Sequence, residues 1–338
     1  MDQGKSTSVG LGMPNLPLGI IPGHVDLQSK AELEKNIKTV TLNQIVKALT
    51  VQPEEAKAAS EPDPRSILFK GTFEEVNKFF YETGLSDGLP IVPPTVKKVR
   101  EFLKFTDRSP DEVIGVLLPD NRQATIWNVA VNGVMAGCRP EYMPVLLALA
   151  EAMADPNYGV EHSGNTPGSE TLITINGPII KDLKFNYEQG VLRDGFQANT
   201  TIGRFWRLML RNVAGFLPHR TDKATYGNTW RVVLAENEDA VARIGWEPMS
   251  VDRGFKPGDN VVTIARYTGG GVILSVCGSN AEEVLPYIAE SIVGHIKWEL
   301  VFTVAPWPCF ERPHLILSPI IAETIAKSGW SKKDVKQY

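Results

Sequence analysis

The chain has 338 residues, of which 43% are hydrophobic and 22% are charged, and its formal net charge at pH 7 is −4. This composition is typical of an ordinary globular protein, and the length allows two domains or one large domain with an appendage. The acidic balance and the lack of a basic run argue against binding to nucleic acid. The lack of a signal peptide or a long apolar run predicts a cytoplasmic protein that contacts no membrane.

The first 50 residues predict a small β-α fragment. Residues 16–21 form a short apolar run that ends at Pro22-Gly23, which is typical of a buried strand, and Thr41 is placed to cap a helix over residues 42–49. One strand and one helix bury too little apolar surface to be stable alone, so we expect residues 1–50 to dock on another body. Residues 51–66, which are rich in Pro, Ala and Glu, predict a linker to a main domain over residues 67–338.

The main domain shows helical and strand patterns in alternation. Strands that alternate with helices indicate an α/β fold, here a layered domain with a mixed sheet. Helices are predicted after the capping residues Thr72 and Thr95, over residues 126–136, from Pro140 onward, and over residues 195–211, 281–296 and 319–327. Strands are predicted over residues 171–175, 231–235, 261–267, 272–276, 300–304 and 315–317.

A cluster of polar residues marks the junction between the helix over residues 126–136 and the helix that follows it. Cys138 and Arg139 lie beside a predicted helix N-terminus, where a thiol is expected to have a lowered pKa and to act as a nucleophile or redox partner. A free cysteine is also typical of a small buried hydrophobe, and that alternative stays open. Arg139 and Glu141 are expected to form the wall and anchor of a pocket, in which Glu141 moves protons.

A second candidate site begins the helix over residues 195–211. Asn199 has a side chain of the kind that caps helices, and the N–H groups at a helix start can hold a carboxylate or a phosphate. Arg204 follows one turn later, so we expect both residues to bind an anionic substrate. Ordinary capping explains Asn199 equally well. Arg207 and Arg211 share the helix surface with Arg204.

The third candidate site is the segment 222–237. Lys223 and Tyr226 lie in its loop, and we expect them to bind substrate. Glu236 and Asn237 follow a predicted strand, at the end of the strand where open α/β sheets place ligands. Glu236 is therefore a candidate for proton transfer, and Asn237 a candidate substrate ligand. A solvated loop is the alternative explanation of the segment.

Cysteine and histidine spacing indicates no metal site. Cys138, Cys277 and Cys309 are too few and too scattered for a disulfide scaffold or a thiolate site, and no two of the five histidines have the spacing of metal ligands. His162, in the loop EHSGNTPG, is the histidine that we expect to act as an acid or base. Glycines 269–271 lie between two predicted strands, where a hairpin turn explains them better than a phosphate loop. The sequence identifies no cofactor.

Several stretches of the chain resemble a known group of proteins. DGLPIVPPT, VMAGCRPEYMPV, INGPI, ANTTIGR, AENED and SPIIAETIAKSGWSKKDV are together similar to multidomain proteins related to the UGSC family of (seleno)proteins, and this similarity covers residues 70–338. The stretch GMPNLPLGIIPGHV resembles the tail of the UGSC-like domain that precedes this module in longer relatives. The Cys/Sec-Gly-Ser-Cys stretch of that domain is not found in this chain. The resemblance implies a functional site rather than a particular substrate or reaction.

Two functions are consistent with these observations. The first is an enzyme, or the larger subunit of one, that acts on a small anionic organic molecule by acid–base or thiol-assisted chemistry of a redox or lyase type. The second is a non-catalytic partner that completes a separate subunit carrying the Cys/Sec-Gly-Ser-Cys domain. We prefer the first, and in either case we expect an oligomer.

Overall fold

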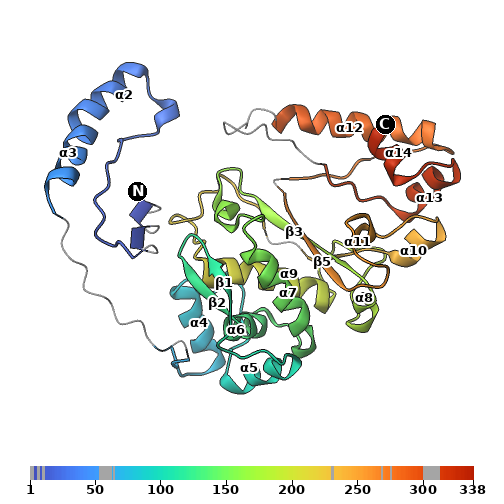
Figure 1. The fold of residues 1–338 in the computed structure, drawn as a ribbon, viewed down its shortest axis with the longest axis horizontal. Helices are drawn as coiled ribbons and strands as arrows, with labels where there is room; N and C mark the ends of the chain where they lie inside the picture. The colour runs from blue at the N-terminus through green and yellow to red at the C-terminus, as the bar shows by residue number, and fades with distance from the viewer. Residues whose placement is uncertain are drawn as a thin grey trace. The chain divides into compact units, whose positions relative to one another are not determined.

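The computed structural model describes residues 4–5, 8–9, 12–52, 63, 65–229, 232–267, 269–274, 276–299 and 313–338, with the side chains of residues 295–299 left out (Figure 1). Helices and strands both occur, which confirms the predicted α/β class, and no helix in these ranges is long and apolar enough to cross a bilayer. The helices are α2 (Lys30–Asn36), α3 (Leu42–Thr50), α4 (Phe73–Glu82), α5 (Val96–Phe102), α6 (Ile126–Ala136), α7 (Met143–Ala154), α8 (Ile179–Asp182), α9 (Gln197–Met209), α10 (Glu238–Arg243), α11 (Met249–Asp252), α12 (Ala281–Glu299), α13 (Pro319–Lys327) and α14 (Lys332–Gln337). The strands are β1 (Val113–Leu117), β2 (Arg122–Thr125), β3 (Glu170–Asn176), β4 (Leu234–Ala235) and β5 (Val261–Tyr267).

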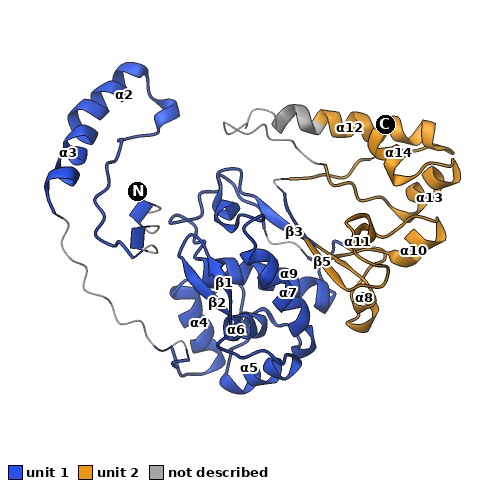
Figure 2. Cartoon of the chain, viewed as in Figure 1, with its two compact units in different colours: residues 1–173, 192–233, 264–268 blue, residues 174–191, 234–263, 269–338 orange. Residues whose placement is uncertain are grey.

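The chain divides into two compact units (Figure 2). Unit 1 comprises residues 1–173, 192–233 and 264–268, and unit 2 comprises residues 174–191, 234–263 and 269–338. The division falls within β3 and within β5, so each unit is built from separate stretches of chain. The sequence analysis treats residues 67–338 as one domain, because hydrophobic periodicity carries no mark of such a division.

The strands form two sheets. β1 and β2 pair antiparallel as a hairpin with an irregularity between Val113 and Gly115, a pair that the sequence analysis did not predict. β3 is the central strand of a mixed sheet in the order β4-β3-β5, and it pairs parallel with β4 so that Thr174 lies opposite Leu234. Because parallel neighbours end at the same edge of a sheet, the residues that follow β3 and β4 come together there.

The core of unit 1 is formed by helices, with α6 packed against α5, α7 and α9. Close packing depends on Gly133 of α6, because a Cβ atom there would lie 2.7 Å from the side chain of Leu146 and 2.9 Å from that of Phe102. α6 begins with a capping box at Thr125 and ends at Gly137, whose φ of +82° is left-handed, and this confirms the predicted helix over residues 126–136. The largest fully buried side chains in the core of unit 1 include those of Tyr142, Met143, Leu146, Leu149, Met153, Phe205 and Trp206.

The core of unit 2 lies between α12 and α13. The strands predicted over residues 272–276 and 315–317 are not formed. Residues 272–274, residue 276 and residues 315–317 pair with no strand in the structure described. Some of their apolar side chains pack against the helices instead, whereas Val272 and Leu274 are 81% and 76% exposed, so burial accounts for only part of the apolar pattern. The strand predicted over residues 300–304 lies outside the described residues. The buried core residues are Ala281, Val284, Leu285, Ile288 and Ile325, and Ile273, Val276, Leu315 and Leu317 pack against them.

The N-terminal fragment is helical, and the prediction of a β-α fragment is wrong in its strand. Residues 16–21 form no strand, and α2 and α3 belong to one continuous helix that starts at a capping box on Ser29. Thr41 lies inside this helix rather than at its start, and its Oγ1 donates to the carbonyl of Ile20 at 2.9 Å. The N–H of Ile20 donates to the Gln44 side chain at 2.7 Å, so the extended segment lies along the helix. Most of the predicted linker lies outside the described residues.

Candidate functional site

The thiol of Cys138 is buried just after α6. The residue is 8% exposed, and burial raises the pKa of its thiol to about 12, although a hydrogen bond with Thr201 and the charge of Arg204 act in the opposite direction. A thiol with this pKa is protonated at neutral pH and is a poor nucleophile. The expectation of a lowered pKa is therefore wrong, because desolvation outweighs the nearby positive charge.

Arg139 and Glu141 bind each other in the turn that precedes α7. The Nε atom of Arg139 donates to Oε1 of Glu141 at 2.7 Å, and the guanidinium lies 5.6 Å from the ring centre of Tyr142. The hydrogen bond from Arg139 lowers the pKa of Glu141, which therefore stays ionised. The two side chains are 41% and 30% exposed, so they form a partly exposed ion pair rather than the expected wall of a pocket shared with Arg204.

The guanidinium of Arg204 is held by the Pro-rich loop before α5. Its Nε and Nη2 atoms each donate to one carboxylate oxygen of Asp87 at 2.8 Å, and Nη2 also donates to the carbonyl of Pro90 at 3.0 Å. The side chains of Arg204 and Asp87 are only 12% and 7% exposed. Arg204 therefore fixes this loop to α9, and protein acceptors occupy the donors that we expected to face a substrate.

Asn199 does not cap α9. The helix starts at Gln197 after Phe196, so Asn199 lies within its first turn. Its side chain is fully buried and donates to the carbonyl of Val233 at 2.8 Å, while the N–H of Val233 donates back to the Asn199 carbonyl at 2.9 Å. Asn199 thus joins α9 to the segment around Val233. Its side chain makes this structural contact rather than the predicted helix cap or a contact with an anion.

The other arginines of α9 are also engaged. Nη2 of Arg207 lies 2.6 Å from Oδ2 of Asp222, and Nη1 lies 3.8 Å from Oε2 of Glu170, and both carboxylates are almost fully buried. Arg211 follows α9 and donates to the carbonyl of Gly84 at 2.5 Å, and burial lowers the pKa of its guanidinium. The arginine row therefore ties neighbouring loops to the helix.

A cavity of about 610 Å³ lies between two loops of unit 1. Residues 163–169 form one loop and residues 218–228 the other, and the N–H of Lys223 donates across to the carbonyl of Gly164 at 3.0 Å. We call this cavity the loop pocket. It is lined by Ser163, Gly168, Ser169, Arg207, Pro218, His219, Arg220, Asp222, Lys223, Ala224, Thr225, Tyr226, Gly227 and Asn228.

The two loops approach each other closely at Gly168. Its φ is +71°, and a Cβ atom there would lie 2.6 Å from the Cα of Gly227. The side chain of Asn228 donates to the Gly168 carbonyl at 2.8 Å, which holds the contact. Only glycine fits this position, because any side chain would both strain the backbone and push the loops apart.

The buried wall of the loop pocket has two serine hydroxyls. The Oγ atom of Ser163 lies 3.4 Å from the hydroxyl of Tyr158, which lies 2.6 Å from Oγ1 of Thr171. Ser169 is 5% exposed, and its Oγ atom has no hydrogen-bond partner within the part of the chain that the structure describes. An unpaired buried hydroxyl costs about 1–3 kcal/mol, and Ser169 is one of the residues that line the loop pocket.

The exposed wall of the loop pocket has positive charge. Arg220 and Lys223 are both exposed, and Lys223 forms no ion pair among the described residues. Asp222 is the one carboxylate among the lining residues, and Arg207 already binds it. His219 adds an imidazole on a backbone with φ +67°, an uncommon conformation for a residue other than glycine. The pocket is therefore suited to an anion.

Glu236 belongs to a different polar cluster, in unit 2. Asn176 ends β3, and its side chain donates to Glu236 at 2.5 Å and to Glu238 at 2.9 Å. The N–H of Met249 donates to the same oxygen of Glu236 at 2.8 Å. Asn237 caps α10 by accepting from its first turn. The ends of β3 and β4 do bring these residues together. The contacts named here are all made within unit 2, so they stabilise its fold.

His314 lies close to this cluster. Desolvation and the charge of Arg253 lower the pKa of its imidazole, and the carboxylate of Glu236 opposes them. His314 is therefore neutral at pH 7.

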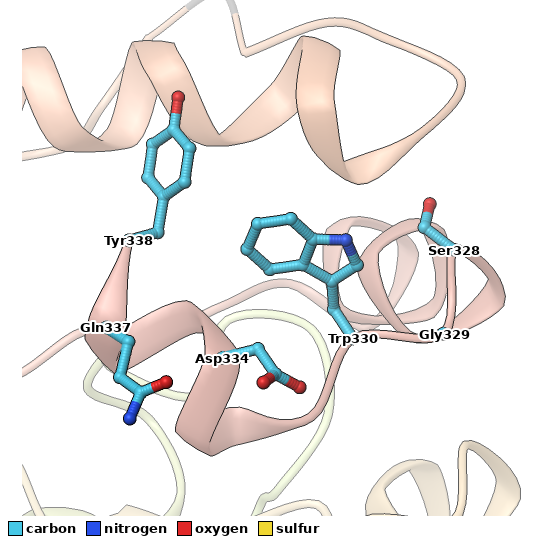
Figure 3. Close-up of a pocket in the computed structure, with 6 residues that line it drawn as sticks. All are labelled: Ser328, Gly329, Trp330, Asp334, Gln337 and Tyr338. Atoms are coloured by element: carbon cyan, nitrogen blue, oxygen red, sulfur yellow. The ribbon is translucent and has the colours of Figure 1, made fainter.

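A second cavity, of about 490 Å³, lies at the C-terminal helices (Figure 3). Trp330 and Tyr338 form an edge-to-face pair beside it, with ring centres 5.8 Å apart. The carboxylate of Asp334 accepts from Ser331 as a helix cap, and the indole N–H of Trp330 donates to Glu282 at 3.3 Å. These groups already have partners, so this cavity is a weaker candidate site than the loop pocket.

Two predicted site residues, Lys223 and Tyr226, line the loop pocket, and Tyr226 is fully exposed there. His162 precedes the pocket residue Ser163, but its side chain is 65% exposed and lies 3.8 Å from Glu161. The predicted residues that the structure places elsewhere are Cys138, Arg139, Glu141, Asn199, Arg204, Glu236 and Asn237. The sequence analysis missed five lining residues, whose one common signal is their position in two loops dense in small and polar residues: Ser163, Ser169, His219, Arg220 and Asn228. Arg207, which the sequence analysis places beside Arg204, reaches the pocket from α9.

The comparisons with known proteins leave the geometry as the basis for assigning a function. No protein-family model, no curated protein and no solved structure matches the chain.

Proposed function

We propose that the chain is an enzyme, or the larger subunit of one, that binds a small anionic organic molecule in the loop pocket. The observation that carries this proposal is the combination of the unpaired buried hydroxyl of Ser169 with the exposed positive charges of Arg220 and Lys223 around one cavity. An anion would pair with the charges and accept from the hydroxyl, which removes the cost of leaving it unsatisfied. The resemblance to UGSC-related proteins supports a site in this module.

The chemistry we propose is proton transfer of a lyase type. His219 is the imidazole among the lining residues and has no ion pair in the part of the chain described, so we assign it the role of acid or base. Lys223 would hold the anionic group next to the carbon that loses a proton. Cys138 takes no part, because its buried thiol stays protonated.

Hydrogen exchange from carbon tests this proposal. The purified chain is incubated in D₂O with a mixture of small carboxylates and phosphate esters, and proton NMR reports which C–H signals disappear. We expect one anion to exchange with the natural chain, and exchange to be lost with His219→Gln and Lys223→Gln. Lys97→Gln, an exposed charge change on α5, is the matched control. If the natural chain and the His219→Gln variant exchange at the same rate, the assignment to this pocket is wrong.

The second candidate function is a non-catalytic partner of a subunit that carries the Cys/Sec-Gly-Ser-Cys domain. It is favoured by α3, on which Leu42, Val46 and Leu49 are 51%, 51% and 82% exposed and fall on one face of the helix. This face belongs to the fragment that resembles the tail of the UGSC-like domain. Under this function the chain alone would be poorly soluble, whereas a monodisperse chain that turns over a substrate would favour the first function.

A further inference from the structure

We infer that the loop pocket takes a phosphate monoester, held by its dianionic phosphoryl group. This inference rests on the proposed function and narrows its substrate class. The phosphoryl group would accept a hydrogen bond from Ser169 and pair with Lys223 and Arg220, which line the same cavity.

The charge of the pocket is the first argument. Of its lining cations, Arg207 is paired with Asp222 at 2.6 Å, and Asp222 is the one carboxylate among the lining residues. Arg220 and Lys223 therefore contribute two positive charges that no lining carboxylate pairs with, and Asp120, which lies outside the lining, also attracts Arg220. A phosphate monoester has a charge of about −1.5 to −2 at pH 7, which matches two such charges, whereas a single carboxylate leaves one of them unpaired.

The placement of the hydrogen-bond donors in both loops is the second argument. Ser169 belongs to the 163–169 loop, and Lys223 and Arg220 belong to the 218–228 loop, so both loops contribute donor residues to the lining. In addition, the backbone N–H groups of Tyr226 and Gly227 bind no backbone carbonyl in the described structure. The three terminal oxygens of a phosphoryl group can accept from several directions at once, whereas the two oxygens of a carboxylate accept in one plane.

Binding of methyl phosphate, compared with binding of acetate and succinate, tests this inference. Affinities are measured by titration calorimetry on the full chain at pH 8 and at a fixed ionic strength set with NaCl. We expect methyl phosphate to bind more tightly than either carboxylate. Ser169→Ala is expected to weaken it by about tenfold or more, because a hydrogen bond to a charged group is lost. Lys223→Gln is expected to weaken it by about three- to fivefold, and Lys97→Gln to leave it unchanged.

The outcomes separate this inference from the proposed function. If succinate or acetate binds in the pocket and methyl phosphate does not, the phosphoryl inference is overturned while an anion site remains. If methyl phosphate binds equally to the natural chain, Ser169→Ala and Lys223→Gln, it binds elsewhere, and the inference also fails. If none of the three anions binds, the phosphoryl inference fails, and loss of the D₂O exchange signal as well would remove the proposed function. Circular dichroism of each variant shows that the fold is retained.

Discussion

Arg204 and Asp87 form a two-point ion pair that links α9 to a loop 117 residues away in the chain. Because both side chains are nearly buried, removal of either partner leaves an unpaired charge in the core. We expect Arg204→Ala and Asp87→Ala each to lower the free energy of unfolding by about 3–5 kcal/mol.

Urea unfolding of the single variants and of the double variant measures this effect. We expect the double variant to be less destabilised than the sum of the single variants, because it leaves no unpaired charge. Arg100→Ala on α5, an exposed arginine, is the control and should change stability by less than about 0.5 kcal/mol. An Arg204→Ala variant with normal stability but lost anion binding would return Arg204 to the role of substrate ligand.

The thiol of Cys138 should be unreactive in the folded chain. Its pKa of about 12 leaves almost no thiolate at pH 8, so iodoacetamide should modify the exposed Cys277 in the native protein and Cys138 only after denaturation. Peptide mass spectrometry reads out both positions. Rapid native modification of Cys138 at pH 8 would restore the thiol hypothesis.

The same pKa makes stability depend on alkaline pH. The folded thiol has a pKa above its ordinary value of 9.0, so above pH 9 the unfolded chain releases a proton that the folded chain keeps. This contribution should destabilise the fold by about 1.4 kcal/mol for each pH unit until the pH reaches the folded pKa. Cys138→Ala should therefore lose less stability than the natural chain between pH 9 and pH 11. Parallel curves for the two proteins would contradict the raised pKa.

Local sequence signals predicted the helices that have clear ends. α6 matches because Thr125 caps its start and Gly137 takes a left-handed conformation at its end, and both signals are read from neighbouring residues. α13 matches for a similar reason, since Ser318 caps a helix that opens with Pro319. Where the cap-type residues lie inside a helix, as at Asn199, the same reasoning fails, because the side chain binds a carbonyl 34 residues away.

The candidate site could be predicted only in part, because its partners are distant in the sequence. The sequence shows Arg204, Arg207 and Arg211 along one helix, and such a row indicates an anion site. The acceptors that already bind these arginines come from distant loops, so the sequence does not show them. Lys223 was found because it lies in a polar loop between structured segments. Ser169 was missed because an unpaired hydroxyl is visible only after every neighbour is placed.

The imidazole of His314 should titrate below its ordinary pKa. Desolvation and the charge of Arg253 both lower it, and so Arg253→Gln should raise the pKa of His314. Proton NMR of the histidine ring signals measures the change, and Lys256→Gln, an exposed charge change in the same unit, should not produce it.

The lowered pKa of His314 also determines how its contribution to folding stability changes with pH. The unfolded imidazole, with a pKa near 6.5, takes up a proton before the folded one does, so stability present above pH 6.5 is lost as the pH falls. Arg253→Gln should reduce this acid sensitivity. A His314 pKa above 6.5 in the natural chain would contradict the prediction.

Gly168 should be essential for the loop pocket but not for the fold. Gly168→Ala places a Cβ atom 2.6 Å from the Cα of Gly227, so the two loops must separate and the distance from Ser169 to Lys223 must change. We expect the unfolding free energy to fall by about 1–2 kcal/mol from the left-handed backbone alone, and methyl phosphate affinity to fall by about tenfold or more. Gly245→Ala is the matched control, because Gly245 has a φ of +72° and no atom within 4 Å of the added Cβ. It should show the same backbone cost with no loss of binding. Equal binding by both glycine variants would mean that the anion is not held between these loops.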